Sequence, residues 1–298
     1  MKYNKLGSSE VEVSEVSFGC MSLGENHSAN AALLHQALDK GITLFDTADL
    51  YQKGENESRV GKAFRGVRNK VVLATKVGNQ WRCDGSGWDW NPTKAYILQA
   101  VEESLKRLQT DYIDLYQLHG GTIQDPIDET IEAFELLKQQ GKIRAYGISS
   151  IRPNVIREYV KRSHLASVMM QYSLLDRRPE ETCFDLLQEH NIGVLARGSY
   201  AQGLLLNKPA KDYLSHSEEE VKRAAGAVKQ LADRGRTAAE VAARFTIGHP
   251  AVTSAVLGIR TKKHLQDALQ VAEASPLNEE EMKALQQAVE PNKYEQHR

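Results

Sequence analysis

Several common sequence features are scarce or absent in this chain. Only three cysteines occur among its 298 residues, and Cys20, Cys83 and Cys183 lie too far apart to form a CxxC motif or to indicate a disulfide framework. No apolar run reaches the length of about 18 residues that a membrane-spanning helix needs. The first residues also lack the apolar segment of a secretory signal. We therefore expect a cytoplasmic protein with no membrane partner.

An excess of charge of either sign is also missing. The chain has 38 Lys and Arg against 39 Asp and Glu, a formal net charge of -1, and it has no basic tract. Its electrostatics therefore gives no reason to expect nucleic acid as a partner. The hydrophobic share of 41% and the charged share of 26% are typical of globular proteins. No composition break divides the chain, so we expect a single domain over residues 1–298. The sequence indicates no oligomeric state.

Short apolar runs alternate with amphipathic stretches along the chain. The apolar runs are eight candidate strands, at 16–20, 42–46, 71–76, 113–118, 143–149, 166–171, 192–197 and 253–257. The amphipathic stretches are candidate helices, near 28–40, 55–65, 93–109, 127–140, 152–163, 180–190 and 237–248, with another after Thr261. Eight such alternations predict an α/β fold, the (β/α)8 or TIM barrel. The absence of a GxGxxG motif after the first strand weighs against a Rossmann domain.

Three further segments lie outside the eight repeating units. Residues 3–6 and 11–13 flank a Gly-Ser-Ser turn and predict an N-terminal β-hairpin that could close the barrel floor. Residues 217–234 and 278–289 predict two extra helices, the second with a capping box.

The loop between Asn79 and Asn91 contains all three tryptophans of the chain, Trp81, Trp88 and Trp90. Two interpretations are open. The rings could pack onto the barrel as part of a surface flap, or they could form an aromatic wall over an apolar substrate. Loops that follow barrel strands build the mouth of this fold, which favours the second interpretation.

Four polar residues follow apolar runs in successive segments. Asp46 and Lys76 end the second and third candidate strands, Tyr51 lies in the loop after Asp46, and His119 follows the fourth strand. Catalytic groups of a barrel collect at the C-terminal ends of its strands. We therefore expect these four side chains to meet at one barrel mouth.

Together these residues predict acid–base chemistry at a carbonyl group. A tyrosine hydroxyl has a pKa of about 10, and we expect the ammonium of Lys76 to lower the pKa of Tyr51. Asp46 would pair with Lys76, and His119 would bind the substrate oxygen or share the tyrosine proton. Such a set stabilises negative charge on the oxygen and delivers a proton to it. It offers no obvious nucleophile and no metal cluster, and it suits hydride transfer from a nicotinamide.

Six motifs, taken in order, resemble those of the aldo-keto reductase family. They are Phe45-Asp-Thr-Ala-Asp-Leu-Tyr51, Gly54-Glu-Asn-Glu57, Ala74-Thr-Lys76, Ser104-Leu-Lys-Arg-Leu108, Asp111-Tyr-Ile-Asp-Leu-Tyr-Gln-Leu-His119 and Gly141-Lys-Ile-Arg-Ala-Tyr-Gly-Ile-Ser149. The resemblance extends over nearly the whole chain. It is to the bacterial branch of the family that also includes the potassium-channel β subunits.

The resemblance implies an NADPH-dependent reductase of aldehydes and ketones, with Asp46, Tyr51, Lys76 and His119 as its catalytic residues and Tyr51 as the general acid. It also implies a set of residues that bind the NADPH or NADP+ cofactor. Those for the nicotinamide end are Gly19, Met21, Asp46, Ser149, Gln171 and Arg197, and those for the pyrophosphate are Ser199, Gln202, Gly203, Leu204 and Leu205.

The segment from Gly258 to His264 is placed by the resemblance at the adenosine phosphate. Arg260 and Lys262 begin a predicted helix there, where cations oppose the helix dipole. A bound 2'-phosphate would relieve this conflict and could also use the helix N-terminus. The segment therefore favours NADPH over NADH.

Two residues of the nicotinamide site depart from the family pattern. Ser150 stands where the family usually has asparagine, which leaves the carboxamide with a shorter partner. Arg197 stands where many members have an aromatic ring on the nicotinamide. A planar guanidinium can stack in the same place, but its charge is unfavourable beside the oxidised ring.

The small-molecule carbonyl substrate is not identified by the sequence. The expected pocket residues are Leu50, Trp81, Trp88, Trp90 and Gly121, which favour a hydrophobic or aromatic aldehyde. Two alternatives to a reductase are open. One is a nicotinamide-binding sensor or regulatory subunit with little turnover. The other is a lyase or isomerase that uses Lys76 as a Schiff-base amine, which an acidic partner such as Asp46 disfavours.

Overall fold

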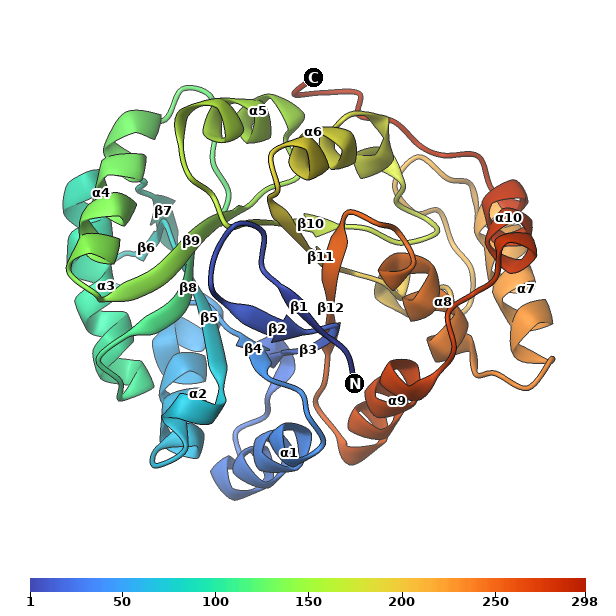
Figure 1. Cartoon of the computed structure of the whole chain (residues 1–298), viewed down its shortest axis with the longest axis horizontal. Helices are drawn as coiled ribbons and strands as arrows, with labels where there is room; N and C mark the ends of the chain where they lie inside the picture. Colours follow the sequence, from blue (N-terminus) through green and yellow to red (C-terminus); the bar gives the residue numbers. More distant parts are fainter.

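Eight parallel strands close into a barrel at the centre of the computed structural model, which describes residues 1–298 (Figure 1). Around the barrel they follow chain order: β3 (Val16–Gly19), β4 (Leu44–Asp46), β5 (Val72–Val77), β8 (Ile113–Leu118), β9 (Ile143–Ser149), β10 (Ser167–Gln171), β11 (Gly193–Arg197) and β12 (Val252–Gly258). The predicted (β/α)8 barrel is confirmed. The predicted strand ends differ from these by at most two residues.

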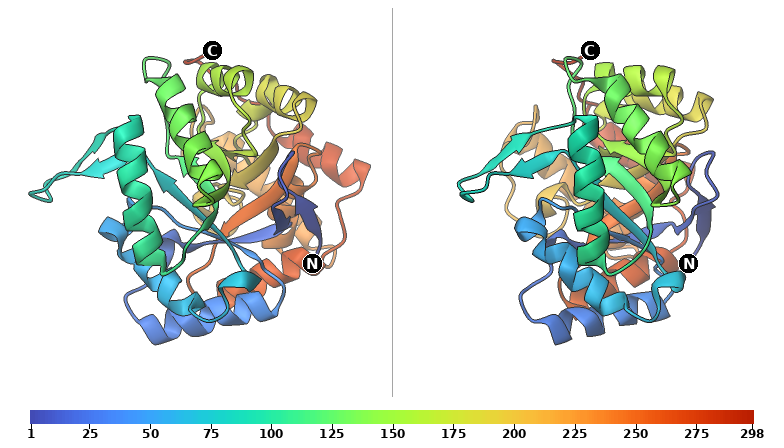
Figure 2. Two further views of the ribbon diagram at one scale, coloured as in Figure 1. Left: turned by 60° about the vertical axis from the view of Figure 1, so that its left-hand side comes forward. Right: turned by 90° about the vertical axis from the view of Figure 1, so that its left-hand side faces the viewer.

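Helices surround the barrel on its outside (Figures 1 and 2). Each barrel strand is followed by one of them: α1 (His27–Asp39), α2 (Glu55–Phe64), α3 (Lys94–Leu108), α4 (Ile127–Gln139), α5 (Pro153–Arg162), α6 (Cys183–Glu189), α8 (Ala238–Ile247) and α9 (Lys262–Glu273). The two predicted extra helices are α7 (Glu218–Ala232) and α10 (Glu279–Ala288), which pack against each other. No helix has both the length and the apolar character that crossing a bilayer requires.

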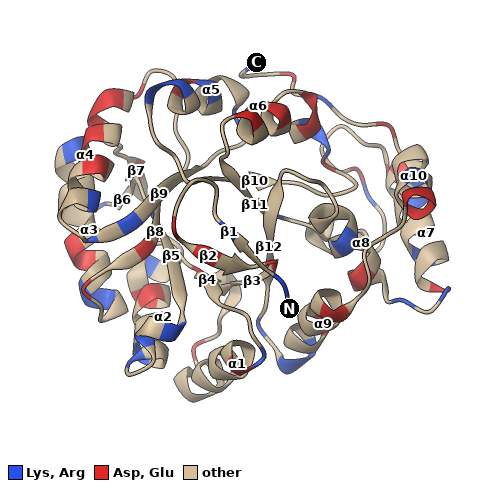
Figure 3. Cartoon of the chain, in the orientation of Figure 1, with Lys and Arg blue, Asp and Glu red and all other residues tan.

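Local sequence explains where these helices begin. Thr93 caps α3 by accepting a hydrogen bond from the backbone N–H of Tyr96, and Asn278 forms the predicted capping box of α10 with Glu281. The surrounding helices contain Lys and Arg as well as Asp and Glu (Figure 3). Short 3₁₀ turns lie at Cys20–Ser22, Tyr51–Gly54, Arg68–Lys70, Arg178–Glu181 and Ala201–Gly203.

The core has two parts, on the outside and the inside of the barrel wall. A cluster of 70 buried residues fills the space between strands and helices. A smaller cluster of 11 lies inside the barrel, and it includes Leu6, Val11 and Val13 of the N-terminal hairpin. This hairpin, β1 (Tyr3–Lys5) and β2 (Glu12–Ser14), closes the barrel floor as predicted.

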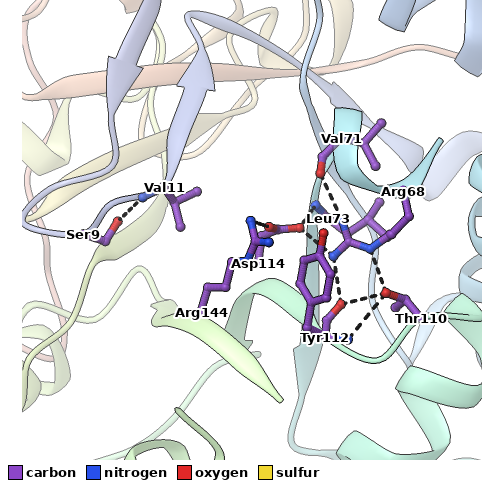
Figure 4. Close-up of polar contacts among 9 residues, drawn as sticks. All are labelled: Ser9, Val11, Arg68, Val71, Leu73, Thr110, Tyr112, Asp114 and Arg144. Atoms are coloured by element: carbon purple, nitrogen blue, oxygen red, sulfur yellow. Dashed lines mark hydrogen bonds and ion pairs between the residues drawn. The ribbon is translucent and has the colours of Figure 1, made fainter. Parts of the chain in front are cut away.

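A buried carboxylate at the floor end of the barrel joins three neighbouring strands (Figure 4). Asp114 of β8 accepts hydrogen bonds from Arg68 Nη2 at 2.7 Å and from the backbone N–H of Leu73 at 2.9 Å, and it pairs with Arg144 Nη1 at 3.0 Å. The ring of Tyr112 lies 4.0 Å from the Arg68 guanidinium and 4.1 Å from that of Arg144. These contacts fix β5, β8 and β9 relative to one another, below the strand ends that carry the polar residues.

Two expectations about loops and helices need correction. The tryptophan loop is a hairpin, β6 (Asn79–Trp81) and β7 (Trp88–Trp90), that projects from the barrel (Figure 2). Asp84-Gly85 at its tip is the turn signal that could have predicted it. The helix expected at 180–190 is split into a 3₁₀ turn and the short α6.

Loss of the floor contacts should destabilise the whole barrel. Leu6 is fully buried, so Leu6→Ala leaves a cavity and should lower the free energy of unfolding by about 2–5 kcal/mol. Chemical denaturation measures the difference. Lys5→Ala, next in sequence but exposed and paired only with Glu10 at 3.2 Å, is the matched control and should change stability little. Equal stability of Leu6→Ala and the native chain would contradict a floor closed by this hairpin.

Candidate active site

The four predicted polar residues come together at the C-terminal end of the barrel. Tyr51, Lys76 and His119 line a cavity of about 700 Å³ there, and Asp46 contacts Lys76 from below. Asp46 is the last residue of β4, Lys76 lies in β5, and His119 follows β8 directly. Parallel strands bring these positions to one edge of the barrel, which is why their spacing in the sequence predicts the cluster.

Lys76 and Asp46 form a buried ion pair. The lysine Nζ lies 2.7 Å from each carboxylate oxygen of Asp46 and 2.7 Å from the carbonyl oxygen of Thr47. Burial alone would lower the pKa of Lys76, but the charge of Asp46 and its hydrogen bonds to the ammonium work in the other direction, and the pKa of Lys76 is raised. The ammonium therefore stays charged with all three of its protons directed to acceptors. Such a lysine is a poor Schiff-base amine.

Tyr51 lies beside this ammonium, in a turn of unusual backbone geometry. The Lys76 Nζ is 5.2 Å from the centre of the tyrosine ring. The next three residues, Gln52, Lys53 and Gly54, have φ of 52°, 54° and 87°, and two of them are not glycine. Left-handed conformations cost energy in residues other than glycine, and functional sites are one of the places where they cluster.

The prediction that the pKa of Tyr51 is lowered is wrong. Burial raises the pKa of Tyr51 above its ordinary value, and the attraction of Lys76, which works in the other direction, only partly offsets it. The sequence revealed the neighbouring cation but not how much of the ring is buried. A raised pKa keeps the hydroxyl protonated at neutral pH.

His119 is neutral in this environment. Burial, followed by the charges of Lys76 and Arg197, lowers the pKa of His119 to about 3. Its ring stands edge-on to that of Tyr51, with the two centres 5.9 Å apart. Its Nδ1 is buried without a partner in the chain. A neutral imidazole can donate one hydrogen bond to a ligand in the cavity without delivering a full charge.

The apolar wall of the cavity contains four of the five expected pocket residues: Leu50, Trp88, Trp90 and Gly121. Trp90 is fixed by its Nε1, which donates to the carboxylate of Asp125 at 3.0 Å. The fifth residue, Trp81, lies elsewhere. It lines a separate cavity of about 280 Å³ beside α3, where the Lys53 ammonium lies 5.2 Å from its ring.

Of the residues expected at the nicotinamide, Met21, Ser149 and Arg197 line the main cavity. Gln171 contacts Arg197, whose Nη1 donates to Gln171 Oε1 at 2.9 Å. Gly19 ends β3 and pairs with Asp46 on one side and with Gly258 on the other. Three of the six residues expected at the nicotinamide therefore line the cavity, and Gln171 and Asp46 contact residues that line it.

Gln171 has a fixed orientation that the sequence did not predict. Its Nε2 donates to Asp176 Oδ2 at 2.8 Å and to the Tyr213 hydroxyl at 3.1 Å. Asp176 is fully buried and is bound by the guanidinium of Arg178. Because a carboxylate only accepts hydrogen bonds, the amide nitrogen must face Asp176 and the amide oxygen must face Arg197. No local pattern identifies Asp176 and Tyr213 as partners, since both act through contacts made by folding.

The residues expected at the pyrophosphate form a tight turn after β11. The backbone N–H groups of Gly203, Leu204 and Leu205 are already bonded within it, and both leucine side chains are buried. The buried Ser199 hydroxyl has no partner, and Gln202 has a φ of 58°. Ser199 thus offers a free polar group for a ligand, whereas the backbone N–H groups of Gly203, Leu204 and Leu205 are already occupied.

The basic segment after β12 remains open to a ligand. Arg260 and Lys262 are exposed and form no ion pair, whereas the neighbouring Lys263 pairs with Asp267. Lys262 begins α9, where the first N–H groups of a helix lack partners within the helix. His264 has a buried Nδ1 without a partner. These orphaned groups fit the phosphate end of a nucleotide cofactor.

Comparison with known proteins agrees with this geometry. Residues 15–290 match the model of the aldo/keto reductase family. The chain is 51% identical, over the full length of both, to an uncharacterised oxidoreductase, YqkF, of Bacillus subtilis. It is 31% identical to the aldo-keto reductase YhdN of the same organism, over 97% of this chain and 94% of that one.

Solved structures are similar as well. The holo form of the aldo-keto reductase AKR11C1 from Bacillus halodurans superposes with a TM-score of 0.94 at 50% identity, over 100% of this chain and 99% of that one. The glycerol dehydrogenase AKR11B4 from Gluconobacter oxydans superposes with a TM-score of 0.86 at 29% identity, over 99% and 97%.

The neutral state of His119 should make folding depend on pH. The pKa of His119 is depressed in the folded chain, so the unfolded chain binds the extra proton between about pH 3 and the ordinary value of 6.5. The stability contributed by the neutral ring is complete above that window and is lost as the pH falls through it. Relative to His119→Gln, the native chain should lose up to about 1.4 kcal/mol per pH unit in this window. Denaturation of both proteins at several pH values tests this, and parallel curves would contradict it.

Proposed function

The chain belongs to the aldo/keto reductase family of oxidoreductases, and on this premise we propose that it reduces aldehydes or ketones to alcohols with NADPH. One observation carries the proposal. A protonated tyrosine, a buried Lys76–Asp46 ion pair and a neutral histidine converge on a cavity that also has an apolar wall. This set can protonate a carbonyl oxygen and stabilise the charge that develops on it.

Each residue has a distinct role in the proposed reaction. Tyr51 holds its proton at neutral pH because burial raises its pKa, so the hydroxyl is available to donate to the carbonyl oxygen. The Lys76 ammonium would stabilise the phenolate that remains. Neutral His119 would donate a hydrogen bond to the same oxygen and orient the substrate. A nicotinamide bound at this end of the cavity would supply the hydride for the carbonyl carbon.

The residues around the cavity also support a nicotinamide cofactor. Gln171 presents its amide oxygen next to Arg197, where it could accept from the N–H of a carboxamide. Ser199 and the start of α9 offer free polar groups where phosphates would lie. Arg260 and Lys262 have no acidic partner, so a 2'-phosphate would gain their charge without displacing one. This is why NADPH is proposed rather than NADH.

Removal of the Tyr51 hydroxyl should abolish reduction. Tyr51→Phe keeps the ring but removes the proton donor, so turnover of 4-nitrobenzaldehyde should fall by about 10²- to 10⁴-fold, while NADPH binding stays close to native. Absorbance of NADPH measures turnover, and quenching of tryptophan fluorescence measures binding. Tyr3→Phe, at an exposed tyrosine of the hairpin on the barrel floor, is the control. Retained turnover in Tyr51→Phe would refute the proposed acid. Binding without turnover by the native chain would favour the sensor alternative.

Loss of the two free cations should discriminate between the cofactors. The double variant Arg260→Gln and Lys262→Gln should weaken NADPH binding roughly tenfold to a hundredfold, through lost charge-assisted hydrogen bonds, and leave NADH binding nearly unchanged. Fluorescence titration with each cofactor gives the two dissociation constants. Lys62→Gln with Arg65→Gln, two exposed cations around the end of α2, is the matched control. An equal loss for both cofactors would contradict recognition of the 2'-phosphate.

A further inference from the structure

The cavity that contains Tyr51 is lined by charge of one sign only. Lys76, Arg152 and Arg197 line it, and no aspartate or glutamate does. Lys76 is neutralised by Asp46 beneath it, and Arg197 donates to Gln171 on the side where the nicotinamide is proposed to bind. Arg152 is therefore the cation of the cavity that has neither an acidic partner nor an assigned role.

Arg152 is fixed in place without being neutralised. It is half-buried and directly precedes α5, and its Nη1 donates to the carbonyl oxygen of Gly121 across the cavity wall. Its backbone N–H donates to the Ser150 hydroxyl at 3.2 Å. The Nε and Nη2 groups make no hydrogen bond or ion pair within the chain. A guanidinium held at one corner and free along the Nε–Nη2 edge presents the fork that binds a carboxylate with two hydrogen bonds.

Nearby acidic groups do not account for this arginine. The Asp125 carboxylate is occupied by the indole N–H of Trp90 and by the backbone N–H and hydroxyl of Thr122, and it does not line the cavity. Glu295, in the C-terminal segment on the other side of Arg152, forms no ion pair with it. By contrast, the exposed Arg82 and Arg162 each pair with an aspartate.

The remaining wall is apolar and partly open. Trp88 is 46% exposed and Ile151 is 40% exposed, both at the mouth of the cavity, and Leu50 and Trp90 lie deeper. A cavity with a largely apolar lining and a few polar groups is typical of a small-molecule site. The cavity thus combines an apolar surface, a proton donor and an unpaired cation.

We propose that the physiological carbonyl substrate carries a carboxylate on an apolar or aromatic body, and that Arg152 binds this carboxylate. The inference rests on the proposed reductase function and adds the substrate class to it. Ser150 contributes as a positioning residue, since its hydroxyl binds the backbone of Arg152. A carboxylate is the favoured anion because one guanidinium edge offers two donors, which matches two oxygens.

The test compares acids with their esters. The ratio kcat/KM is measured with NADPH for 2-, 3- and 4-formylbenzoate and for the three methyl esters, at constant ionic strength. The native chain should prefer at least one formylbenzoate over its ester by about tenfold to a hundredfold, the range expected for hydrogen bonds to a charged group. Arg152→Gln should remove this preference by raising KM for the acid while leaving kinetics on the ester close to native.

Two further variants test whether the preference depends on the charge of Arg152, on its two-donor geometry or on its position in the cavity. Arg152→Lys keeps the charge but loses the two-donor fork, so it should retain only part of the preference. Arg234→Gln removes an exposed arginine between α7 and α8 that forms no ion pair, and it should retain the full preference. Turnover of the esters shows that each variant is folded.

The outcomes distinguish failure of the carboxylate site from failure of the reductase function. If the native chain reduces the esters as well as the acids, or better, it is a reductase without a carboxylate subsite, and the inference is wrong. If the preference survives in Arg152→Gln, another group binds the anion, and the assignment of Arg152 is wrong. If neither acids nor esters are reduced by the native chain, the reductase function fails and the inference fails with it.

Discussion

The buried ion pair between Lys76 and Asp46 is the interaction on which the rest of the site depends. Burying two charges is costly, and the pair persists because each carboxylate oxygen lies 2.7 Å from the ammonium and because the carbonyl of Thr47 accepts the third proton. The charged ammonium adds to burial in lowering the pKa of His119, and it is placed to stabilise the phenolate of Tyr51. Burial and this one ion pair together set the protonation states of the site.

This contact requires an exact strand arrangement, and several distant features maintain it. Asp46 pairs with Ala74 across β4 and β5, and Lys76 pairs with Gln117 across β5 and β8. A slip of one residue would turn either charged group from the barrel interior to the helix layer. The hairpin on the barrel floor and the Asp114 network stabilise the opposite ends of the same strands. Residues at the barrel floor therefore help to hold the strands in the register that the ion pair needs, although no floor residue touches the cavity.

Much of this arrangement could be predicted from the sequence because it follows from local pattern and topology. Apolar runs such as Ile113–Leu118 identified the strands, and the rule that strand ends share one edge placed Asp46, Lys76 and His119 together. Trp81 was misplaced because its environment depends on Lys53 and α3, which no local pattern connects to it. The direction of the Tyr51 pKa shift was wrong because the sequence reveals a neighbouring charge but not the depth of burial.

Two other features of the site could not be predicted from the sequence, because they depend on contacts between distant segments of the chain. The orientation of Gln171 is set by Asp176 and Tyr213, the second of which is 42 residues away in the sequence. The sequence does not reveal that Arg152 lines a cavity that contains no acidic residue. In both cases the informative quantity is which hydrogen-bonding groups remain free after the chain has folded.

The most direct test of the central claim is the rate of NADPH-dependent reduction of 4-nitrobenzaldehyde by Lys76→Met. Thermal unfolding and NADPH binding are measured on the same protein to establish that it is folded. The ion pair is claimed to stabilise the tyrosine phenolate, so the rate should fall by about a hundredfold or more while NADPH still binds. A folded Lys76→Met protein that binds NADPH and reduces the aldehyde at nearly the native rate would contradict the claim.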